Sequence, residues 1–156
     1  MSAAVSDEFS ELLKTLNRLF WTLTAIAVAF LGSGYLLHRR GLTIPSSPAG
    51  LKIWGILLLT LAAILGVALP ILMRTLFNRR AVSAKHVSKS EFVAHHKRLI
   101  IIAISAAYVA GAAYILVVPG LYLYGSVLCG LYGIYSAIPQ ERKLKGEMRY
   151  YGLDGK

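Results

Sequence analysis

Tyrosine is the enriched polar residue of this chain, with nine in 156 residues. Tyr108 and Tyr132 each fall about midway along an apolar segment, where a phenol hydroxyl must find a hydrogen-bond partner or face a polar cavity. This pattern has two interpretations, a pocket for a small ligand or plain hydrogen bonding between helices. The pocket would lie where the two halves of the chain meet and would be lined by Tyr108, Tyr132, Tyr135 and Ser105.

Basic residues form the second group that could recognise a ligand. Anionic lipid headgroups attract each basic residue near the membrane surface by ~1 kcal/mol. A basic face at the inner helix ends would therefore hold such headgroups, and a lipid-modifying enzyme would place its chemistry on the same face, beside His95. The predicted headgroup-binding residues are Arg74, Arg79, Arg80, Lys97, Arg98, Arg142 and Lys143.

The sequence shows no recognisable catalytic or metal-binding pattern. His86, His95 and His96 share one basic segment, but no two of them are four residues apart, the spacing of a helical metal site. Cys129 is the only cysteine, which excludes disulfides within the chain and thiolate metal cages. We therefore predict no catalytic residue, no metal ion and no cofactor.

The composition requires lipid as the solvent for much of the chain. It is 56% hydrophobic and 15% charged, with a mean hydropathy of +0.61, so too few polar residues remain to cover a soluble domain. A helix needs about 20 apolar residues to cross a bilayer, and four segments of about that length contain no Asp, Glu, Lys, Arg or His. These segments are Leu19–Leu37, Ile53–Met73, Leu99–Val118 and Leu121–Ile138. They lack the buried charges of proton relays and ion-coupled pumps.

The distribution of Lys and Arg predicts the orientation, because basic residues near helix ends stay on the cytoplasmic side. Of the 17 lysines and arginines, only Arg39, Arg40 and Lys52 fall between the first two apolar segments, and none falls between the last two. The N-terminus, the long central loop and the C-terminus are thus predicted to be cytoplasmic. This arrangement explains the net charge of +10 without a nucleic acid partner. We expect a bacterial or archaeal plasma membrane, since no import presequence is recognisable.

The two halves of the chain resemble each other. The matched residues, in the same order, are Gly32, Tyr35, Gly50, Gly55 and Pro70 in the first half and Gly111, Tyr114, Gly120, Gly125 and Pro139 in the second. They place repeat 1 at about 6–80 and repeat 2 at about 88–145, with a cytoplasmic tail at 146–156. Because each repeat crosses the membrane twice, both have the same orientation, which implies a pseudo-two-fold axis along the membrane normal. We predict an all-α fold with one membrane domain (1–156), in which two tandem hairpins form a four-transmembrane-helix bundle.

Small residues predict where the helices approach each other, because packing in a bilayer depends on close van der Waals contact. One small residue recurs every four positions in each of the last two apolar segments. The stripes are Ala103, Ala107 and Gly111 in the third segment and Gly125, Cys129 and Gly133 in the fourth. Only a tight turn at Val118-Pro119-Gly120 connects these segments, so they must be neighbours and their stripes are expected to face each other.

Local signals predict where some helices begin and bend. Ser88 and Glu91 fit a capping box, so a helix is expected to begin at Lys89, well before the third apolar segment. Pro70 and Pro139 lie towards the inner ends of their segments, where a proline bends or ends a helix, and a bend is expected at Pro70. The N-terminal helix is predicted to extend inward with an apolar stripe of Phe9, Leu12, Leu13, Leu16 and Leu19.

Three functions remain open on this evidence. The leading hypothesis is a non-catalytic oligomeric or accessory subunit that packs through small residues, carries a basic cytoplasmic face, and has membrane lipids, its own copies or another membrane protein as partners. The first alternative is a small transporter or channel for a neutral or apolar solute, with the site between the two repeats. The second is a lipid-modifying membrane enzyme.

Overall fold

The computed structural model describes residues 3–41, 48–84 and 87–153, and within these ranges the chain is helical without any strand. The helices in chain order are α1 (Ala3–Arg39), α2 (Pro48–Ala63), the π-helix η1 (Ile64–Ala68), α3 (Leu69–Ala84), α4 (Lys89–Ile115), α5 (Gly120–Ala137) and α6 (Glu141–Tyr150). The predicted capping box is confirmed at the start of α4. There the Ser88 hydroxyl accepts from the Glu91 N–H at 3.2 Å, and the Glu91 carboxylate accepts from the Ser88 N–H at 3.2 Å.

Three helical stretches are long and apolar enough to cross a membrane, which agrees with a membrane protein. They run over Phe9–Arg39, Gly50–Ala81 and Lys89–Ile115. A fourth is obtained when α5 is taken together with α6, which follows it after a bend of 63°. The central segment predicted as a long loop is mostly helical, because α3 continues to Ala84 and α4 already begins at Lys89.

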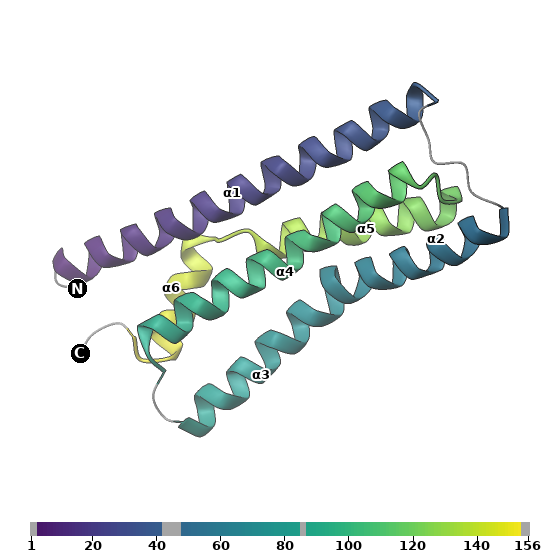
Figure 1. Cartoon of the computed structure of the whole chain (residues 1–156). Coiled ribbons are helices and arrows are strands. Elements are labelled where there is room, and N and C mark those ends of the chain that lie inside the picture. The colour runs from purple at the N-terminus through teal and green to yellow at the C-terminus, as the bar shows by residue number, and fades with distance from the viewer. Residues whose placement is uncertain (1–2, 42–47, 85–86, 154–156) are drawn as a thin grey trace.

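Helix α4 is the central element of the bundle. It packs against α1 on one side and against α5, α2 and η1 on the other, and α2 also packs against α5. Figure 1 shows the start of α1, the end of α3, the start of α4 and α6 at one end, here named the α6 end. The end of α1, the start of α2 and the connection between α4 and α5 lie at the opposite end. The α4–α5 contact confirms that the last two apolar segments are neighbours.

The two predicted hairpins pack differently. Helices α4 and α5 lie against each other, whereas α1 and α2 make no comparable contact within the described residues and lie on opposite sides of α4 (Figure 1). A two-fold axis that exchanged the hairpins would give α1 and α2 the contact that α4 and α5 have. The duplication and its axis therefore stay predictions made from the sequence pattern.

Pro70 distorts the second apolar segment as expected, and the distortion takes the form of η1. A proline has no N–H, and its ring clashes with the carbonyl group four residues earlier, here that of Gly66. The chain accommodates the ring with one π-turn, in which the Leu69 N–H donates to the Ile64 carbonyl, five residues back. The helix thus continues through α3 and carries Arg74 to the α6 end.

At Pro139 the helix ends instead of continuing. Helix α5 stops two residues before Pro139, and α6 follows at an angle of 63°. Helix α6 ends in a Schellman motif, in which Leu153 N–H donates to the Met148 carbonyl at 2.9 Å and Gly152 N–H to the Arg149 carbonyl at 3.2 Å. Gly152 adopts the left-handed φ of +67° that this motif requires. The chain then turns back and buries Leu153, so much of the segment predicted as a tail packs on the bundle.

At the α6 end the helices are held together by large apolar side chains. The predicted stripe of α1 is confirmed there, with Phe9 and Leu16 buried and its other members packed against them. Phe92 of α4 and Leu144 and Met148 of α6 belong to the same cluster.

In the apolar middle of the bundle, backbone approaches backbone through small residues. Gly133 lies against the Ala103 carbonyl group, as predicted, and Ala107 also faces α5, but its partner there is Gly130. The face of α5 that is buried against the bundle consists of Ser126, Gly130, Gly133 and Ala137. Gly111 instead faces the Phe30 ring of α1, Gly125 faces Leu59 of α2, and the carbonyl group of Cys129 faces Gly66.

Candidate functional site

A cavity of about 410 Å³ opens at the α6 end between α3, α4 and α6. Its walls come from segments far apart in the sequence, which the continuation of the helix through η1 into α3 and the 63° bend between α5 and α6 bring together. The lining residues are Arg74, Phe77 and Asn78 of α3, His95, His96 and Leu99 of α4, and Arg142, Lys143, Gly146, Glu147, Tyr150 and Tyr151 of α6 and its C-terminal cap. We name this cavity the inner pocket.

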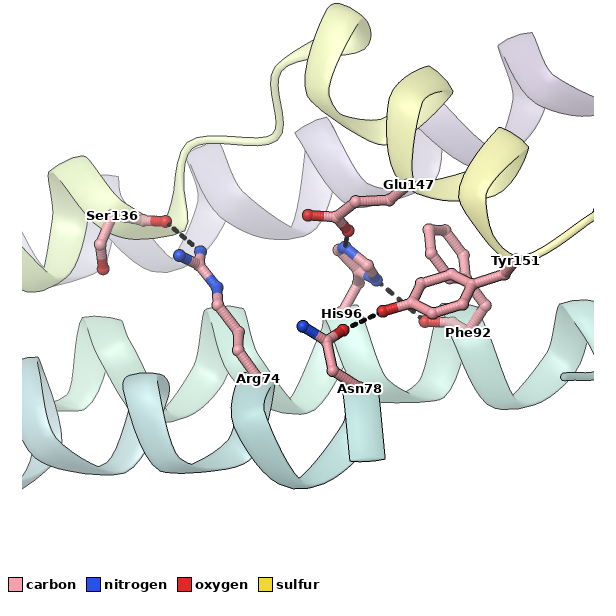
Figure 2. Close-up of polar contacts among 7 residues, drawn as sticks. All are labelled: Arg74, Asn78, Phe92, His96, Ser136, Glu147 and Tyr151. Carbon is pink, nitrogen blue, oxygen red and sulfur yellow. Dashed lines mark hydrogen bonds and ion pairs between the residues drawn. The ribbon is translucent and has the colours of Figure 1, made fainter. Parts of the chain in front are cut away.

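Arg74 is fixed in the inner pocket by the end of α5. Its Nη2 donates a hydrogen bond of 2.8 Å to the Ser136 carbonyl oxygen (Figure 2). The last carbonyl groups of a helix have no intrahelical partner and carry the negative end of the helix dipole, so a guanidinium group is a favourable cap there. The guanidinium has five N–H donors, and this contact leaves others for a ligand.

His96 and Glu147 tie α6 to α4. His96 Nε2 lies 2.9 Å from Glu147 Oε2 and Nδ1 lies 3.0 Å from the Phe92 carbonyl oxygen (Figure 2). Both ring nitrogens thus face oxygen atoms, one of α4 and one of α6. Burial by itself would raise the pKa of Glu147, but the His96 hydrogen bond and the charges of His96, Lys143 and Arg74 lower it overall.

An aromatic wall closes one side of the inner pocket. The Phe77 and His95 rings stack with centroids 4.1 Å apart and an interplanar angle of 13°. His95 lies outside the apolar segment that begins at Leu99, and burial together with the charge of His96 lowers its pKa to about 4. It is therefore neutral near pH 7. The Tyr151 hydroxyl adds a third tether by donating to Asn78 Oδ1 (Figure 2).

The inner pocket carries more positive than negative charge. Arg74, Arg142 and Lys143 line it, with Glu147 as the one carboxylate among its lining residues. Within the described part of the chain, no carboxylate lies at ion-pair distance from Arg142 or Lys143, because Glu147 is bound by His96. Burial and the neighbouring Arg74 charge lower the pKa of Lys143, and the charge of Glu147 offsets only part of this effect.

The structure divides the predicted basic face between two places. Arg74, Arg142 and Lys143 line the inner pocket. Arg79, Arg80 and Arg98 line a second, wider groove of about 940 Å³ between α3 and α4, which shares Phe77 and His95 with the inner pocket. Lys97 lines neither of these two cavities. His86 lies outside the described residues, and among those described no three His, Cys, Asp or Glu side chains are grouped to hold a metal ion.

The predicted tyrosine pocket is not assembled by this fold. Tyr108 faces α1, and its hydroxyl donates to the Leu23 carbonyl oxygen at 3.0 Å. Tyr132 and Tyr135 are 45% and 69% exposed on α5, and the Ser105 hydroxyl bonds to the Ile101 carbonyl of its own helix. The four side chains do not converge, so the geometry favours the second interpretation, hydrogen bonding between helices.

Replacing Tyr108 with phenylalanine should cost about 1 kcal/mol of stability, because one interhelical hydrogen bond is lost without leaving a new buried donor. The expected result is a small fall in the thermal midpoint of the detergent-purified protein. Tyr135→Phe is the matched control and should have no effect, since its ring is exposed. If Tyr135→Phe lowered the midpoint as much as Tyr108→Phe, the Leu23 contact would not be the cause.

The fold and the inner pocket define a class, an all-helical protein with three or four helices able to cross a membrane and a basic cavity at one end. Comparison with known protein families, curated proteins and solved structures gives no match for this chain. The function is therefore argued from the pocket and the bundle alone.

Proposed function

We propose that this chain is a non-catalytic, multi-pass protein of a bacterial or archaeal plasma membrane that acts as an oligomeric or accessory subunit. It has four transmembrane helices, with the α6 end and both termini in the cytoplasm. There the basic residues of α3, α4 and α6 engage anionic lipid headgroups.

One observation carries this proposal, the separation of charge and apolar surface along the bundle. The apolar segments have large exposed side chains such as Leu57, Leu121 and Leu128, which suit a lipid environment. The hydroxyl groups of Tyr108, Ser105 and Ser126 in those segments bond to backbone carbonyl groups. The ionisable groups of the inner pocket all lie at the α6 end.

The two alternatives have less support. A transporter for a neutral solute was expected to use Tyr108 and Tyr132, which do not face a common cavity. A lipid-modifying enzyme would need a free base or nucleophile in the inner pocket. His96 and Glu147 are bonded to each other there. His95 is stacked on Phe77, and its pKa of about 4 makes it a weak base.

The orientation can be tested with single cysteines in a Cys129→Ala background. Arg40 and Gly146 are exposed at opposite ends of the bundle. A membrane-impermeant maleimide should label Arg40→Cys in intact cells, and it should label Gly146→Cys only after permeabilisation. The reverse pattern would overturn the cytoplasmic assignment of the α6 end.

The subunit role requires a second measurement, the native mass of the protein in lipid nanodiscs. A discrete oligomer, or a stoichiometric complex with another membrane protein, is the expected result. A monomer that turns over phospholipid in the same nanodiscs would contradict the non-catalytic proposal.

A further inference from the structure

We propose that the inner pocket is a specific binding site for an anionic phosphate group, held between Arg74 of α3 and Arg142 and Lys143 of α6. This inference rests on the proposed function for the location of the pocket at the cytoplasmic membrane surface. It goes further by assigning one cavity and one ligand chemistry to a face otherwise described only as basic.

The inner pocket has a net positive charge. Three cations line it, and its single carboxylate, Glu147, is occupied by His96. Cations on α3 and α6 that face one cavity repel each other, and an anion between them would turn that repulsion into attraction. A site that gathers three cations from two helices against one carboxylate, which His96 already binds, carries an excess of positive charge that suits an external anion.

The hydrogen-bond donors of the pocket suit a phosphate group. Arginine presents a planar fork of N–H groups that matches the oxygens of a phosphate, and lysine adds a compact point charge. The hydrogen bond from Arg74 to the Ser136 carbonyl fixes the position of its guanidinium before any ligand arrives. Such preorganisation reduces the side-chain entropy lost on binding.

The size and position of the inner pocket also suit a phosphate-bearing ligand. A cavity of about 410 Å³ is within the range of small-molecule sites, and it exceeds the space that a phosphate group alone fills. Arg74 directly follows the apolar segment that ends at Met73, and α6 begins soon after Pro139. The pocket therefore lies at the depth of lipid headgroups, where the phosphate could come from an anionic phospholipid or from a soluble phosphate ester.

Binding there has a structural consequence for α6. Polar contacts that already link α6 and its cap to the bundle include the His96–Glu147 pair and the Tyr151–Asn78 hydrogen bond. A phosphate bound by Arg74 and by Arg142 or Lys143 would add a direct link between α3 and α6. The ligand should therefore hold α6 more firmly against the bundle.

The test compares two double variants with the same change in charge on the same helix. Arg142→Gln/Lys143→Gln removes the two pocket cations, and Lys145→Gln/Arg149→Gln removes two cations of α6 that do not line the pocket. The full-length protein in detergent micelles is titrated with short-chain phosphatidylglycerol, short-chain phosphatidylcholine and glycerol 3-phosphate, and binding is followed by calorimetry. Hydrogen exchange of α6 is measured with and without each probe.

We expect phosphatidylglycerol to bind the wild-type protein and to slow exchange in α6. The pocket variant should bind at least about tenfold more weakly, since it loses two charge-assisted contacts to the phosphate. The control variant should stay within about twofold. Binding of glycerol 3-phosphate as well would support a pocket open to soluble phosphate esters, and its failure to bind would identify the lipid headgroup as the source.

Several results would overturn the assignment. They are no binding of either anionic probe, equal binding of phosphatidylcholine and phosphatidylglycerol, or equal losses in the pocket and control variants. The last would mean that only the overall charge of α6 matters. None of these results would alter the cysteine-labelling pattern or the native mass, so the proposed subunit role is judged separately.

Discussion

Replacing Phe92 with alanine is expected to lower the free energy of unfolding by about 3–5 kcal/mol and to release α6 from the bundle. Phe92 is 1% exposed at the centre of the apolar cluster of the α6 end. Its ring packs on His96 with centroids 4.3 Å apart and on Tyr151 at 6.1 Å. Its carbonyl group, which His96 uses, remains in the alanine variant.

The size of this effect depends on where the cluster lies. Phe92 precedes the apolar segment that begins at Leu99, so in the proposed orientation its cluster faces water when α6 is released. Burial of an aromatic side chain from water is strongly favourable, whereas transfer of the same side chain from lipid is not. The experiment is hydrogen exchange of α6 together with chemical unfolding in micelles.

Leu128→Ala provides the matched control for Phe92→Ala. The Leu128 side chain is 67% exposed on α5 within an apolar segment, so its truncation should be nearly neutral and should leave exchange in α6 unchanged. Equal destabilisation by the two substitutions would show that the α6 end is not a water-facing hydrophobic core.

Local sequence signals predicted the parts of the fold that depend on neighbouring residues. The Ser88–Glu91 capping box, the inward stripe of α1, the distortion before Pro70 and the tight connection between α4 and α5 are all found in the structure. Each follows from a few residues in one segment. The three or four apolar helices follow in the same way from length and hydropathy.

The inner pocket could not be predicted in this way, because its residues meet only after two helices bend. Arg74, Arg142 and Lys143 were predicted as headgroup ligands, but not as parts of one cavity. The contributions of Glu147, Asn78 and Tyr151 were missed. A signal for α6 was available, since Leu144 and Met148 are spaced for one helix face and Gly152 is a suitable C-cap.

The register of the α4–α5 interface could not be predicted from the sequence pattern either. The positions of Gly125, Cys129 and Gly133 repeat every four residues, but the α5 face that is buried is Ser126, Gly130, Gly133 and Ala137. Small residues on neighbouring faces give the same signal, and only the contact of α2 and η1 with α5 decides between them. Gly125 and Cys129 are used for that second contact.

Gly133→Ala is expected to destabilise the protein by about 3 kcal/mol, the upper end of the range for overpacking. Gly133 lies where α4, α5 and η1 meet, and an added methyl group would overlap the Ala103 carbonyl oxygen and lie 3.4 Å from Gly66 Cα. Both neighbours are backbone groups, which cannot move aside as the end of a flexible side chain can. The measurement is the thermal midpoint in micelles together with the yield of folded protein.

A glycine-to-alanine substitution at Gly32 should have the opposite effect on stability. A methyl group on Gly32 would meet nothing within 4 Å, so only helix propensity acts there, and alanine is favoured over glycine by up to about 1 kcal/mol. Gly32→Ala should therefore leave the midpoint unchanged or raise it, while Gly133→Ala lowers it. If both variants raised the midpoint, α4 and α5 would not approach as closely as Gly133 and Ala103 do here, and the small-residue packing that we assign to the middle of the bundle would be wrong.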